Sequence, residues 1–88
     1  MNFSEALVLI KNGSRLTRLN WNGPGQFVFL VPGSTFIVNR APLNVMFPPG
    51  TEIDYLSHID IKTKQGPIVP WLASQTDILA NDWQEVKA

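Results

Sequence analysis

Residues 3–11 show the period of an α-helix, because apolar side chains recur at positions i, i+3, i+4 and i+7. Asn2 and Glu5 match a capping box, in which each side chain binds the backbone N–H of the other residue. Gly13 favours the end of this helix, since glycine readily adopts the left-handed conformation. Val8 is also apolar, so the helix either packs deeply within its own chain or is shared with a second subunit. The apolar face consists of Phe3, Ala6, Leu7 and Ile10.

Residues 15–18 and 27–31 predict two strands separated by a loop that is rich in glycine and turn-forming residues. The second strand reads Phe-Val-Phe-Leu-Val and has no polar face, which is typical of a strand buried on both sides. In so small a protein, such a strand again indicates packing against another subunit. Pro32 and Gly33 end it, and residues 35–38 either continue the sheet or open a loop.

The middle of the chain is rich in proline. Pro42, Pro48 and Pro49 prevent a long helix or a central strand, so we expect residues 39–53 to form an irregular surface connection. Connections of this length often carry function. The pattern leaves three roles open, namely a lid, a second pocket and an interface.

The C-terminal half predicts a hairpin, a short helix and a closing strand. Residues 55–62 predict one strand, in which Ile59 and Ile61 point one way and His58, Asp60 and Lys62 point the other. Residues 68–69 should return antiparallel to this strand after a turn. Ser74 and Asp77 repeat the capping-box pattern at the start of a short helix. Trp83 should anchor the core from the last strand.

Together these elements predict the α+β class, with an N-terminal helix on a small antiparallel β-sheet and a short second helix before the last strand. The length of 88 residues predicts a single domain, residues 1–88. Seven basic and seven acidic residues balance, which argues against a general nucleic-acid or membrane-surface binder. The chain has no cysteine and one histidine, so we expect no metal site and no cofactor. No basic segment precedes the first apolar stretch, which favours a cytoplasmic protein over a secreted one.

Few residues suit catalysis. His58 is the one histidine and shares the polar face of its strand with Asp60, although most such histidines are simply exposed or at an interface. Asp77 and Asp82 are five residues apart, a spacing that a helix does not stack neatly, and Asp77 is better explained as part of a helix cap. We therefore expect that the protein is not an enzyme.

Trp21 and Trp71 give the strongest indication of a binding site. Each lies in a loop at the end of a predicted element, Trp21 before a glycine turn and Trp71 after Pro70. Loop aromatics form flat walls for planar ligands, and each stacked base contributes about 1–3 kcal/mol. Taken alone, the pattern fits a pair of tryptophans that cap the core equally well. The polar residues near them are of the types that give an apolar pocket its specificity, and they are Arg18, Asn20, Asn22, Ser74, Gln75 and Asp77.

Three stretches of the chain resemble a family of small phage and prophage proteins, the second type of Thoeris anti-defence protein. They are residues 1–7, the motif Arg18-x-x-Trp21-Asn22-Gly23 and residues 70–83, and the two tryptophan motifs occur in the order that the family shows. The resemblance covers nearly the whole chain and is weakest over residues 32–53. It implies a protein that acts in the cytoplasm of the infected bacterial host.

The resemblance implies a molecular sponge. Thoeris immunity answers infection with a cyclised ADP-ribose signal that switches on a cell-killing effector, and members of the family bind this signal without cleaving it. They assemble as homotetramers with pockets at subunit interfaces. Some relatives take cyclic oligonucleotide signals of the CBASS type instead or in addition. An enzyme that degrades the nucleotide and a structural or adaptor protein of the phage are the alternatives.

Carried onto this chain, the resemblance implies a ligand-binding site without a catalytic residue. Trp21 and Trp71 would stack on the adenine or close the pocket around it, and Arg18 would meet the pyrophosphate. Phe27 would supply a further apolar wall. The remaining ligand contacts would come from Asn22 and Gly23 in the loop and from Ser74 and Asp77, which would bind ribose hydroxyls or base edges.

Overall fold

The structure is a computed structural model that describes residues 1–21 and 25–87. Its elements are α1 (Phe3–Lys11), β1 (Leu16–Arg18), β2 (Phe27–Val31), β3 (Ser34–Ile37), α2 (Leu43–Met46), β4 (Glu52–Tyr55), β5 (His58–Lys62), β6 (Ile68–Pro70), α3 (Gln75–Ile78) and β7 (Trp83–Glu85). The predicted α+β class is confirmed, with α1 before the sheet and α3 directly before the last strand. Within these described residues, no helix is long and apolar enough to cross a membrane.

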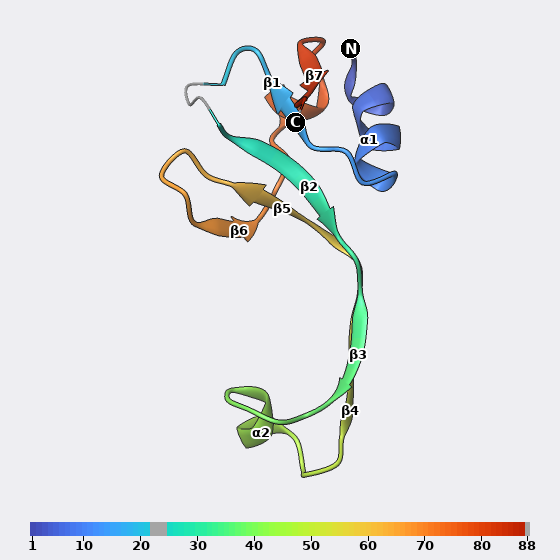
Figure 1. Ribbon diagram of the computed structural model, residues 1–88, viewed down its shortest axis with the longest axis vertical. Coiled ribbons are helices and arrows are strands. Elements are labelled where there is room, and N and C mark those ends of the chain that lie inside the picture. Colours follow the sequence, from blue (N-terminus) through green and yellow to red (C-terminus); the bar gives the residue numbers. More distant parts are fainter. Residues whose placement is uncertain (22–24, 88) are drawn as a thin grey trace.

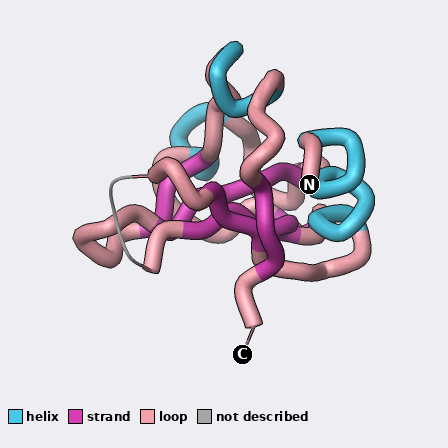
Figure 2. Tube along the Cα trace, turned by 90° about the horizontal axis from the view of Figure 1, so that it is seen from above, coloured by secondary structure: helices cyan, strands magenta, loops and turns pink. Residues whose placement is uncertain are grey.

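The main sheet has five strands in the order β6-β5-β2-β1-β7, and every neighbouring pair is antiparallel. Its central pair aligns Val28 of β2 with Ile61 of β5, and Ile61 in turn faces Val69 of β6, as the predicted hairpin requires. Helix α1 contacts β7, β2 and β1, and Figure 2 shows it against one side of the strands. We refer to this sheet with α1 and α3 as the body.

Helix α1 begins with the predicted capping box. The Asn2 Oδ1 atom accepts a hydrogen bond from the Glu5 N–H (2.9 Å), and the Glu5 Oε1 atom accepts one from the Asn2 N–H (3.0 Å). Ala6 and Ile10 are fully buried against the sheet. Val8 points away and is 58% exposed, so the wide apolar stripe is only partly covered within one chain.

The core of the body is small and centres on Trp83, which is 1% exposed and confirms the predicted anchor. Strand β2 departs from the prediction, because only Val28 is buried and its four neighbours are half-buried. The reason is that α1 covers one face of the strand, whereas no element among the described residues covers the other face to the same degree. The buried cluster consists of Ala6, Ile10, Leu16, Val28 and Trp83.

The predicted single strand over residues 55–62 is wrong, because the chain changes sheets within it. Strand β4 ends at Tyr55, β5 begins at His58, and the two belong to different sheets. Residues 35–38 do not continue the main sheet either, since β3 pairs with β4 to form a separate two-stranded sheet. The prediction of an irregular segment over residues 39–53 is wrong in part, because it contains the four-residue helix α2 and the start of β4.

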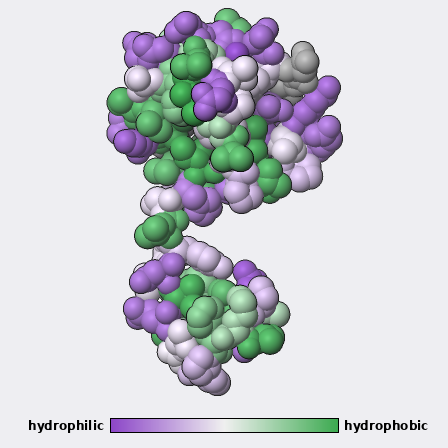
Figure 3. All heavy atoms as spheres, turned by 180° about the vertical axis from the view of Figure 1, so that it is seen from behind, coloured by the Kyte–Doolittle hydropathy of each residue, from purple (hydrophilic) through white to green (hydrophobic). Residues whose placement is uncertain are grey.

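Residues 33–57, which we call the arm, extend away from the body (Figure 1). The arm contains β3, α2 and β4, and it makes the molecule 47 Å long. The radius of gyration is 16.0 Å, whereas a compact domain of this length has a radius of about 12 Å. Figure 3 shows the narrow neck between the two parts. One chain therefore does not fold into a single compact unit.

The neck depends on a close approach of two backbone segments at Gly33. Its N–H donates a hydrogen bond to the Ser57 Oγ atom (2.9 Å). A Cβ atom at Gly33 would lie 2.5 Å from the Tyr55 carbonyl oxygen and 2.9 Å from the Ser57 nitrogen. Both neighbours are backbone atoms, so the two backbone segments would have to move apart to accommodate any side chain at Gly33.

We predict that Gly33→Ala destabilises the protein by about 1–3 kcal/mol, because overpacking against backbone forces the chain to shift. Urea unfolding gives the free energy, and Ser34→Ala, an exposed neighbour on β3, is the matched control. Equal stability of the Gly33→Ala variant and the control would show that the two segments do not approach as described.

Candidate ligand-binding site

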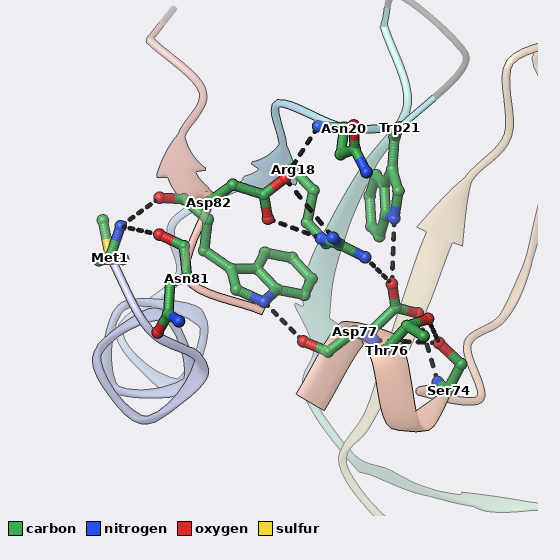
Figure 4. A network of polar contacts seen from close by, with 10 residues as sticks. Met1, Arg18, Asn20, Trp21, Ser74, Thr76, Asp77, Asn81 and Asp82 are labelled. Atoms are coloured by element: carbon green, nitrogen blue, oxygen red, sulfur yellow. Dashed lines mark hydrogen bonds and ion pairs between the residues drawn. The ribbon is translucent and has the colours of Figure 1, made fainter. Parts of the chain in front are cut away.

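Asp77 lies at the centre of a polar network on one side of the body (Figure 4). Its place on α3 follows from the predicted capping box, since the Asp77 N–H donates to the Ser74 Oγ atom (3.1 Å) and the Ser74 N–H donates to the Asp77 Oδ2 atom (3.3 Å). The other carboxylate oxygen, Oδ1, accepts hydrogen bonds from outside α3. Asp77 is buried, and it is the one polar residue in this class among residues 1–21 and 25–87.

Arg18 connects this network to the residues just before β7. Its Nη1 atom donates to the Asp77 Oδ1 atom and its Nε atom donates to the Asp82 Oδ1 atom, each at 2.8 Å. The geometry arises because Arg18 at the end of β1 pairs with Trp83 at the start of β7, which brings the neighbouring Asp82 alongside. Asp82 also accepts a hydrogen bond from the backbone N–H of Asn20 (2.9 Å) and so holds the loop after β1.

The three tryptophans and Phe3 form one aromatic cluster. Trp21 and Trp71 each meet the Trp83 ring edge to face, with centroid distances of 5.3 Å and 5.9 Å. Phe3 from α1 contacts Trp71 and Trp83. The Trp21 Nε1 atom donates to the Asp77 Oδ1 atom (3.1 Å), and the buried Trp83 Nε1 atom donates to the Asp77 backbone oxygen (2.8 Å).

Trp21 and Trp71 therefore combine features of both interpretations that the sequence left open. Each packs against Trp83 as a core-capping residue does, and each remains half-buried with part of its side chain accessible to solvent. Trp21 is further held by its hydrogen bond to Asp77. The two side chains are fifty positions apart in the sequence and contact the same buried indole.

The structure brings most of the predicted site residues together. Arg18, Trp21, Ser74 and Asp77 share one hydrogen-bond network, and Trp71 joins them through Trp83. Asn22 and Gly23 lie outside the described residues.

Phe27 lies in different surroundings from the network. The Arg15 guanidinium is 5.3 Å and the Lys62 Nζ atom 5.8 Å from the centroid of its ring. Phe29 packs beside it at 5.8 Å. Lys62 also donates to the Gly25 carbonyl oxygen (3.2 Å), which places this positive charge next to the end of the loop that starts at Trp21.

Arg18 was expected to bind the pyrophosphate, but in the structure its positive charge is already paired with Asp77 and Asp82. The hydrogen bond to Asp82 is the largest influence that raises the pKa of Arg18, and the bond to Asp77 adds to it. Burial tends to raise the pKa of Asp77, but hydrogen bonds from Arg18, Trp21 and Ser74 outweigh it and lower that pKa. The bond from Arg18 likewise lowers the pKa of Asp82. At neutral pH, one guanidinium is thus shared between two carboxylates.

The site predicted from the sequence left out three residues that contact it or Phe27 in the structure. They are Asp82, Arg15 and Lys62. The five-residue spacing of Asp77 and Asp82 was judged as a helix spacing, yet α3 ends at Ile78 and Asp82 belongs to the turn before β7. The contact between Arg18 and Asp82 could have been expected from the chemistry of arginine, because its planar guanidinium has donors enough to bind two carboxylates. Arg15 and Lys62 become neighbours only through the pairing of β1 and β5 with β2.

The other acid–base candidates lie on a different part of the sheet. His58 begins β5, its Nδ1 atom is 3.1 Å from the Leu56 carbonyl oxygen, and its Nε2 atom is 3.5 Å from the Asp60 Oδ1 atom. Asp77 and Asp82 instead bind Arg18. The four residues proposed for an enzyme thus take part in two separate sets of contacts.

A cavity of about 730 Å³ lies in the arm, apart from the tryptophans. Two aromatic rings, Phe36 and Tyr55, form part of its wall with their centroids 5.5 Å apart. It is lined by Phe36, Asn39, Arg40, Ala41, Pro42, Leu43 and Tyr55. Residues 39–43 of this lining belong to the segment 39–53, for which the sequence left three roles open, namely a lid, a second pocket and an interface.

Comparison with known proteins identifies the family. A model of the Tad2-like domain, described as the Thoeris anti-defense 2-like domain, matches residues 1–86. The chain is also similar to a protein named Thoeris anti-defense 2 from Bacillus phage SP01, with 36% identity over 89 residues that cover 98% of this chain and 94% of that protein. The chain belongs to the Thoeris anti-defense 2-like family.

Membership of the Thoeris anti-defense 2-like family supports a role in phage anti-defence. The match to residues 1–86 includes the arm, so the arm is part of the family domain even though the sequence resemblance was weakest there. It also spans every residue of the network around Asp77. The network therefore lies within the matched family domain.

We predict that Asp77 makes the stability of this Thoeris anti-defense 2-like protein depend on pH. Because the folded-state pKa is lowered, the carboxylate stabilises the fold above its unfolded pKa of about 3.9, and this contribution is lost as the pH falls through the folded value. Asp77→Asn should cost about 1–3 kcal/mol at pH 7, since charged hydrogen bonds are lost. It should also flatten the loss of stability below about pH 4.

Urea unfolding at a series of pH values between 7 and about 2.5 measures both effects. Glu52→Gln on the exposed arm controls for the removal of one negative charge. If Asp77→Asn and the control retain the same dependence on pH as the parent chain, the carboxylate does not hold the network.

Proposed function

We propose that this protein binds and sequesters a cyclic ADP-ribose-type signalling nucleotide without cleaving it and so blocks effector activation in Thoeris immunity. The single observation that supports this most is that Trp21 and Trp71 both pack against Trp83 and remain half-buried, with Trp21 bonded to Asp77 of α3. Two accessible indoles held by a rigid core suit stacking on a base, which needs flat walls and little reorganisation.

The hydrogen bonds of the network suit the base and ribose end of such a nucleotide. Asp77 and Asp82 present acceptors, although Arg18 and Trp21 already occupy part of their capacity. Ser74 and Thr76 offer hydroxyl groups at the start of α3, 2.9 Å from each other. Hydroxyl groups can both donate and accept, so they complement ribose hydroxyls and base edges.

The charges of the site suggest where the phosphates of the ligand lie. With one guanidinium between two carboxylates, the network around Arg18 has a net negative charge and would repel a pyrophosphate. Arg15 and Lys62 flank Phe27 at the other end of the loop that starts at Trp21. We assign the phosphates to these two cations and the base to the tryptophans, which replaces the earlier expectation that Arg18 meets the pyrophosphate.

The proposal includes a homo-oligomer, a tetramer with its pockets at subunit interfaces, that acts in the cytoplasm of the infected host. The half-buried outer face of β2 and the exposed Val8 on α1 leave apolar surface for a second subunit. The release of an intact ligand distinguishes sequestration from an enzyme that degrades the nucleotide. A phage adaptor protein with merely structural tryptophans would bind no nucleotide at all.

We predict that isothermal titration calorimetry detects tight binding of a cyclic ADP-ribose isomer. Heat denaturation should then release the ligand unchanged, as judged by chromatography after long incubation. Recovery of a cleaved product would establish an enzyme, and binding of cyclic oligonucleotides alone would establish a CBASS-type sponge. Absence of binding to both ligand classes would contradict the proposal.

The variant Trp71→Leu separates stacking from packing in the same experiment. Leucine retains apolar contact with Phe3 and Trp83 but removes the flat ring. We expect the affinity to fall about tenfold or more, as the loss of one stacked base implies, while the fold remains intact. Leu72→Ala is the matched control, because the neighbouring Leu72 is 92% exposed.

A further inference from the structure

A carboxylate oxygen in the main sheet lacks a hydrogen-bond partner. The Oδ1 atom of Asp60 is buried, and among residues 1–21 and 25–87 no group donates a hydrogen bond to it. Asp60 lies in the middle of β5, where it pairs with Phe29 of β2 and Pro70 of β6. A buried acceptor without a donor is costly and rare in folded proteins. Since solvent does not reach this oxygen, its donor has to come from a neighbouring side chain.

His58 lies next to this oxygen at the start of β5. Its Nε2 atom is 3.5 Å from the Asp60 Oδ1 atom, and its Nδ1 atom is 3.1 Å from the Leu56 carbonyl oxygen. Leu56 belongs to the neck, in which the chain passes from β4 to β5 (Figure 1). The imidazole ring thus spans the point at which the chain changes sheets.

Both ring nitrogens of His58 face atoms that accept hydrogen bonds. A neutral imidazole carries one hydrogen, so it satisfies either the Leu56 carbonyl or the Asp60 carboxylate and presents a lone pair to the other. The imidazolium carries a hydrogen on each nitrogen and satisfies both acceptors at once. The shorter contact, to Leu56, places the hydrogen of the neutral ring on Nδ1, so the added proton belongs on Nε2.

The surroundings of Asp60 hold few other charges. Strands β2 and β6, the two elements that pack against β5, contain no titratable residue. Lys62 shares the face of His58 and Asp60 on β5, but its Nζ atom donates to the Gly25 carbonyl oxygen (3.2 Å) and lies 5.8 Å from the centroid of the Phe27 ring. Within the part of the chain that the structure describes, His58 is therefore the titratable neighbour whose ring reaches the buried oxygen.

We infer that His58 takes up a proton between its Nε2 atom and Asp60 and so fastens the neck to the main sheet in a pH-dependent way. The hydrogen on Nδ1 stays bonded to Leu56, and the new hydrogen on Nε2 binds the buried carboxylate. Histidine ordinarily changes its charge between about pH 5 and 8, so the link is complete at mildly acidic pH and is lost as the pH rises. The link lies outside the candidate ligand site, so it forms whether or not a nucleotide binds there.

Amide hydrogen exchange in the neck tests the link. The Gly33 N–H, which is bonded to Ser57, should be about threefold more protected at about pH 5.5 than at about pH 7.5, the size expected of a half-exposed ion pair. Protection factors correct for the faster intrinsic exchange at the higher pH. Both pH values lie above the range in which Asp77 takes up a proton, so the network around Asp77 does not contribute. Equal neck protection of the parent chain at the two pH values would overturn the inference.

Two variants identify the partners of the proton. Asp60→Asn and His58→Gln each remove one member of the pair and should abolish the dependence of neck protection on pH. Glu52→Gln, which removes an exposed charge from the arm, is the matched control and should retain it. Asp60→Asn should also leave protection at about pH 7.5 equal to or above that of the parent chain, because it removes a charge whose oxygen is buried without a donor.

The same variants show how the inference fails. Retention of the pH dependence in either Asp60→Asn or His58→Gln would overturn it. A loss of protection in Asp60→Asn that is equal at the two pH values would reveal a donor that does not titrate, and it would overturn the inference as well.

The tautomer of His58 is a separate test, because the chain contains one histidine. With ¹⁵N-labelled histidine, two-dimensional ¹H–¹⁵N spectra at about pH 8 should place the hydrogen on Nδ1, as the contact with Leu56 requires. At about pH 5.5, the Nε2 atom should carry a hydrogen too. A neutral ring with its hydrogen on Nε2 would already supply a donor to Asp60 and would overturn the inference.

Discussion

The carboxylate of Asp77 joins the parts of the body that carry the candidate site. Its Oδ1 atom accepts from Arg18 on β1 and from Trp21 in the following loop, and its Oδ2 atom accepts from the start of α3. The backbone oxygen of the same residue fixes the Trp83 indole in the core. Burial alone would favour the neutral acid, so the ionised state depends on these donors. One residue thus connects a helix cap, an ion pair and the aromatic cluster.

This arrangement explains how a small core can present two tryptophans at its surface. Trp83 provides a buried ring against which Trp21 and Trp71 pack, and the contacts leave each of them half-buried. The ion pair between Arg18 and Asp82 stabilises this arrangement, because it links the end of β1 to the residue before β7. Aromatic walls that are fixed before a ligand arrives lose little conformational freedom on binding. The positions of the two tryptophan side chains are consequently set by the fold of the body.

The sequence predicted the features that depend on local pattern. Both capping boxes, the antiparallel β5–β6 hairpin and the burial of Trp83 follow from residues that are close together in the chain. The arm could not be predicted in the same way, because the change of sheet around Gly33 arises from two segments about 24 residues apart that meet at the neck. The strict alternation of apolar and polar residues begins only at His58, where β5 starts, so the sequence held a signal for the break after Tyr55 that the prediction of one strand did not use.

In the candidate site, too, local contacts could be predicted from the sequence and contacts between distant residues could not. Ser74 and Asp77 were predicted as a helix cap from their spacing, whereas the partners of Arg18 lie 59 and 64 positions away and follow only from the strand order. Arg15 and Lys62 meet at Phe27 through strand pairing in the same way. Membership of the Thoeris anti-defense 2-like family gives these tertiary contacts a functional context that local patterns do not provide.

The most direct test of the central role of Asp77 is an acid titration followed by the indole N–H signals in two-dimensional ¹H–¹⁵N spectra. The three tryptophans give three signals, and the Trp83 hydrogen should exchange most slowly because its hydrogen bond is buried. The Trp21 signal should shift as Asp77 takes up a proton, with a midpoint below the ordinary pKa of an aspartate, and this shift should vanish in Asp77→Asn. A Trp21 signal that is insensitive to acid over this range, or that titrates equally in Asp77→Asn, would contradict the account.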